Sequence, residues 1–160
     1  MERVDALVGR LERWMLIGLL AVMMVLGLLQ IISRFVIKAP ITWSEAMLMY
    51  MFIWFSFIGA SLAVKELAHF EVEIFMIHLP VKMQKFVAIL VNVMIFAFAL
   101  FVISRGSFLV KLNQRQMMAM MPFTMSWPYL VLPLSGACMA IHSLKHILGL
   151  VFRSSSEWGN

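Results

Sequence analysis

Two histidines near the end of the sequence have the spacing of a ligand pair. His142 and His146 lie four residues apart in an apolar segment, so a helix would place both on one face. Such a pair can bind haem iron or another metal. Haem held within a helix bundle also needs a histidine on a facing helix, and the other three apolar segments contain none. We therefore interpret both histidines as interfacial side chains that face headgroups or water, and we expect no metal ion and no cofactor.

A methionine cluster, Met117, Met118, Met120 and Met121, is a second candidate, because thioethers can bind Cu(I). The chain contains 16 methionines, however, and flexible thioether side chains commonly fill irregular apolar contacts. We therefore expect the cluster to pack. The single cysteine, Cys138, is interpreted as a small packing residue.

These residues lie in or beside four long apolar stretches, at about 14–33, 46–64, 86–104 and 128–148. The first three contain no acidic or basic residue, and the fourth begins within a charge-free run from Gln116 to Leu144. About 20 apolar residues in a helix cross a bilayer, and in lipid the backbone must satisfy its own hydrogen bonds. With 63% hydrophobic residues and a mean hydropathy of +0.95, residues 1–160 are predicted to form a single four-helix membrane domain of the all-α class.

The absence of charge within the spans restricts the function. Ion and substrate pathways usually place acidic or basic side chains at membrane depth. This absence argues against a complete transporter, pump or channel, and a small multidrug exporter would need a membrane-embedded carboxylate. No catalytic constellation is present either, so we expect no enzyme.

Positive charge predicts the orientation. Four spans place both termini on one side, with eight of the 13 basic residues, against five on the other. The positive-inside rule therefore puts both termini in the cytoplasm. The net charge of +5 reflects this topology and attraction to anionic phospholipid, and it does not imply nucleic acid. The inner set is Arg3, Arg10, Arg13, Lys65, Lys82, Lys85, Lys145 and Arg153; the outer set is Arg34, Lys38, Arg105, Lys111 and Arg115.

Two connections are expected to carry short helices. Val4, Leu7, Val8 and Leu11 have helical spacing, which predicts an amphipathic helix before the first span. Between the second and third spans, the segment 65–85 also has helical spacing, although an alternating strand pattern competes. Beside a membrane we favour a short interfacial helix that ends at Pro80.

Small side chains mark close helix packing. The second span carries Ser56, Gly59, Ala60 and Ala63, and the fourth carries Gly136 and Ala140 at a four-residue spacing. Such faces let helix backbones approach each other. They would pack either within this four-helix unit or against a partner helix, and the sequence leaves both open. Bulky residues around the rest of the second span predict contact with lipid or another membrane protein.

The segment 34–80 carries a family resemblance. Its marker residues are Arg34-Phe35, Pro40, Trp43-Ser44-Glu45, Trp54, Gly59-Ala60, Lys65, His69 and Leu79-Pro80. In order, spacing and four-span plan, the chain resembles the small membrane (Q) subunit of tripartite ATP-independent periplasmic (TRAP) transporters. Many members of that family have two adjacent acidic residues after the tryptophan, whereas here Ala46 follows Glu45.

The resemblance implies a scaffold subunit in a bacterial inner membrane. A large membrane (M) subunit would carry the substrate and sodium sites, and a periplasmic substrate-binding (P) protein would deliver an organic acid, of C4-dicarboxylate or sialic acid type. Three sets of site residues follow as expectations. The residues expected to dock the binding protein on the outer side are Arg34, Lys38, Trp43, Glu45, Lys111 and Arg115. The residues expected to pack helices or meet the large subunit are Trp54, Ser56, Gly59, Ala60, Ala63, Gly136 and Ala140. Lys65 and His69 are expected at the inner interface, where they would fix the surface helix or contact lipid phosphate.

The alternative hypothesis is a haem-bearing or quinone-side membrane anchor of a respiratory enzyme. Bound haem would favour this hypothesis, and it would make His142 and His146 the functional residues.

Overall fold

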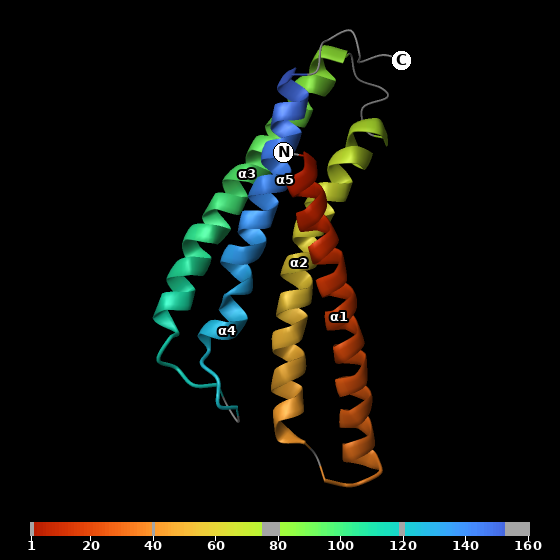
Figure 1. Cartoon of the computed structure of the whole chain (residues 1–160), viewed down its shortest axis with the longest axis vertical. Helices are drawn as coiled ribbons and strands as arrows, with labels where there is room; N and C mark the ends of the chain where they lie inside the picture. The colour runs from red at the N-terminus through yellow and green to blue at the C-terminus, as the bar shows by residue number, and fades with distance from the viewer. Residues whose placement is uncertain (1, 40, 75–80, 119–120, 153–160) are drawn as a thin grey trace.

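The computed structural model describes the chain except residues 1, 40, 75–80, 119–120 and 153–160 (Figure 1). Its elements are α1 (Glu2–Phe35), α2 (Thr42–Ile74), α3 (Val81–Leu112), α4 (Ser126–Tyr129) and α5 (Val131–Phe152). Four of the described helical segments are long and apolar enough to cross a membrane. The described residues form no strand, only one isolated bridge between Met117 and Thr124. The predicted all-α membrane architecture with four spanning helices is confirmed.

The helices form two antiparallel pairs. α1 packs on α2, α3 packs on α5, and the contact between α2 and α5 joins the pairs. Figure 1 shows the pairs close together where α1 begins and α5 ends, and separating toward the opposite end. We call these the terminal end and the connection end. The latter holds the described residues of the two connections, 36–39 and 41 between α1 and α2, and 113–118 and 121–125 between α3 and α4.

The first helix differs from the prediction of a separate amphipathic helix, because α1 is continuous from Glu2 to Phe35. Its 34 residues correspond to about 51 Å, against about 30 Å of bilayer hydrocarbon. Val4, Leu7 and Leu11 are exposed, whereas Asp5 and Glu12 are buried. This section is therefore amphipathic with its apolar face outward and its acidic face toward the bundle.

The second helix also runs further than expected. The segment from Lys65 to Ile74 is helical, but it continues α2 and does not form a separate interfacial helix. No proline or glycine interrupts the sequence between Gly59 and Pro80, and Lys65 and Glu66 contact α1, so the helix has no reason to end at the edge of the membrane. The expected end at Pro80 lies outside the described residues.

Small residues bring α3 and α5 together. Ala99 is fully buried, and a Cβ at Gly136 would lie 3.1 Å from its carbonyl oxygen and 2.9 Å from Ile103 Cγ1. A Cβ at Gly106 would lie 2.6 Å from Leu132 Cβ. The two helices can approach this closely only because glycine occupies both positions.

The outer surface of the bundle is strongly apolar. None of the residues in the most apolar window of α1 is buried within the chain. Large exposed side chains continue along α2 and α3, including Phe52 and Phe98. These surfaces need lipid or another membrane protein to cover them.

Candidate functional sites: an ionic cluster and an apolar cleft

A buried ionic cluster joins three helices at the terminal end. His142 on α5 is fully buried and lies between two carboxylates of α1. Its Nδ1 is 2.5 Å from Asp5 Oδ1, and its Nε2 is 3.1 Å from Glu12 Oε2. Lys145 Nζ donates to Asp5 Oδ2 at 2.7 Å. Lys65 Nζ from α2 donates to the Asp5 carbonyl oxygen at 2.9 Å and lies 3.9 Å from Asp5 Oδ2.

Helical spacing places these groups opposite one another. Asp5, Gly9 and Glu12 follow one stripe of α1, and His142 and Lys145 are three residues apart on α5. Gly9 lets Lys65 reach across the stripe, because a Cβ at Gly9 would lie 2.8 Å from Lys65 Cδ. The absence of a side chain at Gly9 of α1 thus leaves room for the Lys65 side chain of α2.

The arrangement corrects our interpretation of His142. We expected an interfacial side chain that faces headgroups or water, but the imidazole is 0% exposed and has a carboxylate at each ring nitrogen. The error arose because we did not connect the acidic residues before the first span with the histidines near the end of the fourth. Since a carboxylate lies against each ring nitrogen of His142, haem iron has no free position at either nitrogen in this geometry.

Within the described residues, no group of three or more His, Cys, Asp or Glu side chains has an arrangement that could hold a metal ion. The described cluster is instead completed by lysine cations. Buried charges are tolerated when they are paired and hydrogen-bonded, so the cluster can fasten helices together. A second ion pair, Arg13 Nη2 to Glu66 Oε1 at 2.7 Å, joins α1 to α2, but both side chains are more than half exposed.

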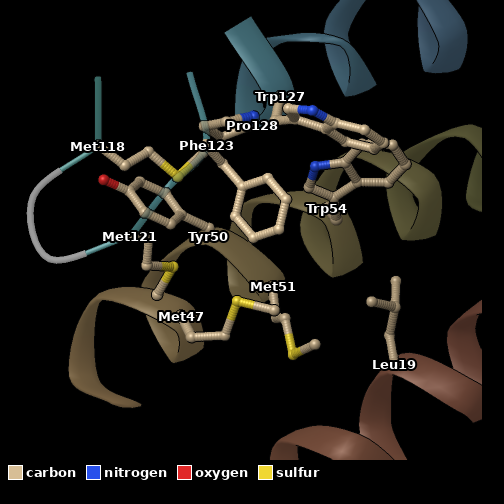
Figure 2. Close-up of a pocket in the computed structure, with 10 residues that line it drawn as sticks. All are labelled: Leu19, Met47, Tyr50, Met51, Trp54, Met118, Met121, Phe123, Trp127 and Pro128. Atoms are coloured by element: carbon tan, nitrogen blue, oxygen red, sulfur yellow. The ribbon is translucent and has the colours of Figure 1, made fainter. Parts of the chain in front are cut away.

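An apolar cleft of about 370 Å³ opens where the helix pairs separate toward the connection end (Figure 2). Loop 113–125 closes back on itself through Met118 N–H to the Phe123 carbonyl at 2.8 Å and Met125 N–H to the Gln116 carbonyl at 2.7 Å. The cleft is lined by Leu19, Met47, Tyr50, Met51, Trp54, Met118, Met121, Phe123, Trp127 and Pro128.

Two members of the methionine cluster, Met118 and Met121, line this cleft beside Met47 and Met51 of α2 (Figure 2). Met117 is exposed, and Met120 lies outside the described residues. Thioethers and aromatic rings therefore form a largely apolar wall. Trp54 of α2 and Trp127 of α4 both line the cleft, and α2 contacts α4 (Figure 2).

The residues predicted for docking all lie at the connection end and are exposed. Arg34 ends α1, Trp43 and Glu45 begin α2, and the remaining basic residues lie in the connections or at the end of α3. Lys38 has a φ of 57°, a left-handed backbone conformation that non-glycine residues seldom adopt. The set is Arg34, Lys38, Trp43, Glu45, Lys111 and Arg115.

The small residues divide between internal contacts and exposed surface. Gly136 packs on α3, whereas Ala140 and Ala63 are half-buried. A Cβ at Gly59 would be 3.9 Å from Leu16 of α1. Two further positions on α2 are exposed and available to a neighbouring helix or lipid: Ser56 and Ala60.

The two residues predicted at the inner interface have different outcomes. Lys65 reaches the Asp5 carbonyl oxygen and so contacts α1. The backbone of His69 lies in α2, and its side chain lies outside the described residues. Asp5, Glu12 and Lys145 were missed as site residues, although the seven-residue spacing of the two acids, with Gly9 between them, could have indicated a buried polar stripe.

The fold and these sites define a class of protein: a multi-pass helical membrane protein with uncharged span centres, ionic contacts at the helix ends and large uncovered apolar faces. Residues 23–153 match the family described as tripartite ATP-independent periplasmic transporters, DctQ component. The chain belongs to this family and is a TRAP transporter subunit.

Three relatives support the assignment. The isethionate TRAP transporter permease protein DctMQ of Oleidesulfovibrio alaskensis is 32% identical over 117 residues, which cover 71% of this chain and 18% of the relative. The sialic acid TRAP transporter permease protein SiaT of Haemophilus influenzae is 30% identical over 91 residues, covering 56% of this chain and 14% of the relative. The sialic acid TRAP transporter small permease protein SiaQ of Vibrio cholerae is 21% identical over 145 residues, covering 91% and 84%. The chain thus spans less than a fifth of the length of the first two relatives and most of the third.

Proposed function

We propose that this chain is the accessory, non-catalytic scaffold subunit of a TRAP transporter that imports an organic acid. It packs against a large membrane subunit and helps to dock a periplasmic substrate-binding protein. The observation that carries the proposal is that the span centres are uncharged while the outer faces of the helices are apolar and exposed. The centres of the four spans contain no acidic or basic residue, while the spanning helices leave broad apolar faces uncovered. A carrier of an anion needs polar groups at depth, whereas a scaffold needs apolar faces.

The relatives support a large partner. Most of the length of the isethionate and sialic acid permeases lies outside the segment similar to this chain. We propose that a separate large subunit supplies that part here, together with the substrate and sodium sites. The names of the relatives favour an organic anion of sialic acid or sulfonate type as the substrate.

The exposed positions of α2 are the proposed contact with the large subunit. Phe52, Ser56 and Ala60 recur every four residues and are all exposed, so they form one stripe of large and small side chains. A neighbouring membrane helix could approach closely at Ser56 and Ala60. Trp54, in contrast, lines the internal cleft, and we propose that it supports α4 against α2.

The proposed orientation puts the terminal end in the cytoplasm and the connection end in the periplasm of a bacterial inner membrane. The exposed charged set at the connection end would then meet the binding protein. Such peripheral charges affect association rate and specificity more than the integrity of a complex.

Affinity purification of the tagged chain from its native membrane in mild detergent tests the partner. We expect a large many-span permease to co-purify in equal amount. Recovery of a soluble redox subunit or bound haem in its place would contradict the proposal and restore the respiratory-anchor hypothesis.

Charge reversal tests the docking role. We expect Arg34→Glu or Lys111→Glu to lower uptake at limiting binding-protein concentration, with an effect that weakens as salt rises. The amount of co-purified permease should not change. The matched control is Arg3→Glu, because Arg3 is an exposed residue at the terminal end. Unchanged uptake in both connection-end variants would remove the docking role.

A further inference from the structure

The ionic cluster contains one more hydrogen bond than a neutral imidazole can make. His142 approaches Asp5 with Nδ1 and Glu12 with Nε2, and each contact is short enough for a hydrogen bond. An ionised carboxylate only accepts hydrogen bonds, and a neutral imidazole donates from one nitrogen only. One of the two contacts therefore requires an additional proton taken from solution.

Chemistry places this proton on the imidazole. Imidazole is a stronger base than a carboxylate, so a proton between these two kinds of group favours the ring. Lys145 at 2.7 Å stabilises the ionised form of Asp5. We propose that His142 is a resident proton-binding site and that its imidazolium latches the N-terminal section of α1 onto α5.

The surroundings support a latch. The apolar window of α1 has no buried residue, so little internal packing holds this helix beyond its contact with α2. Glu12 has no cation closer than His142 among the contacts of the described residues. Loss of the proton would leave a buried carboxylate facing a ring nitrogen lone pair, which is a costly arrangement in a site of low exposure.

Each helix packed around His142 contributes identified groups. From α1 come Asp5 and Glu12, from α2 comes Lys65, and from α5 come Lys145 and the Cys138 thiol, which faces Glu12. From α3, the Asn92 carbonyl accepts a hydrogen bond from Ser143 at 2.7 Å. His146 lies one turn further along α5. Lys65 and Lys145 contact Asp5 and not Glu12. The hydrogen bond to Glu12 therefore depends on the proton of His142.

The protonation state can be measured directly. The full chain with ¹⁵N-labelled histidine is placed in phospholipid nanodiscs, and the His142 resonances are identified by their loss in His142→Gln. We expect both ring nitrogens to carry a proton at neutral pH. A neutral ring, with a proton on only one nitrogen, would overturn the proposal.

The latch is tested by a distance between spin labels at the terminal end. Val4→Cys on α1 and Met83→Cys on α3 use exposed positions. The Cys138→Ala background removes a thiol that faces Glu12, so its ¹⁵N spectrum must first show the same imidazolium signal as the unchanged chain. We expect a narrow distance distribution while the imidazolium signal persists. The pH is raised from about 6.5, the ordinary pKa of imidazole, until that signal disappears. The distribution should broaden when the signal disappears, and in His142→Gln it should be broad throughout.

Two controls separate the latch from general loosening. Labels at Phe35→Cys and Leu112→Cys report on the connection end, where no change is expected. Glu66→Gln removes the exposed Arg13–Glu66 pair between α1 and α2 and should leave the terminal-end distance unchanged. A terminal-end distance that stays narrow in His142→Gln would show that the proton does not hold α1, and would overturn the latch.

Discussion

At the scale of single residues, the ionic cluster depends on the absence of a side chain at Gly9 as well as on its charged groups. Gly9 lies between Asp5 and Glu12 on the buried stripe of α1, and the Lys65 side chain occupies the space where its Cβ would be. Lys65 can therefore donate to the Asp5 carbonyl and approach its carboxylate. Burial of this kind is tolerated because each acid has a cationic or hydrogen-bonding partner.

Gly9→Ala should displace Lys65 and remove its contact with Asp5. A hydrogen bond from a charged group contributes about 1.5–3 kcal/mol, so Gly9→Ala should be less stable than Gly18→Ala by about that amount. Gly18 is the matched control, because it lies on the same helix with no atom within 4 Å of its Cβ position. Both variants gain the same helix propensity, which cancels in the comparison. Unfolding of the two purified variants in detergent gives the difference, and equal stabilities would contradict the role of Gly9.

At the scale of elements, the α3–α5 contact is the most extensive among the described helices, and the α1 contacts are the most polar. Gly106 and Gly136 let backbone meet backbone on α3 and α5, whereas α1 relies on ion pairs at one end. The two pairs of helices therefore differ in how they are held, and they separate toward the connection end (Figure 1).

Gly136→Ala should push α3 and α5 apart, since the new Cβ would meet a backbone oxygen at 3.1 Å. Overpacking of this kind costs about 1–3 kcal/mol, which a thermal unfolding measurement in detergent resolves. Gly149→Ala on the same helix, with nothing within 4 Å, should leave stability unchanged or raise it by up to about 1 kcal/mol. If Gly136→Ala matched that control, the glycine would not set the distance between the helices.

Length and hydropathy were sufficient to predict the spanning helices, because a bilayer imposes a minimum apolar length and a helical backbone. The continuity of α1 and α2 was harder to predict. Apolar spacing in residues 4–11 suggested a helix on the membrane surface, while the acidic stripe that binds α5 lies on the same turns. The partner of each acid is more than 125 residues away in sequence, at separations of 137 and 130, so no local pattern could connect them.

At the scale of the whole molecule, the chain is apolar on its outside and charged at its ends, which suits a subunit held between lipid and a larger membrane protein. Its family is a transporter family, yet the centres of its four spans contain no acidic or basic residue that could bind a substrate anion or a cation. The account therefore predicts that transport requires another subunit.

The most direct measurement is uptake of a radiolabelled organic anion into proteoliposomes across which an inward sodium gradient is applied. Liposomes would contain this chain alone, the co-purified large permease alone, or both, each with the periplasmic binding protein supplied outside. The account predicts no uptake above protein-free liposomes for this chain alone and full uptake only when both membrane subunits are present. Substrate accumulation by this chain alone, or full uptake by the large permease without it, would contradict the account.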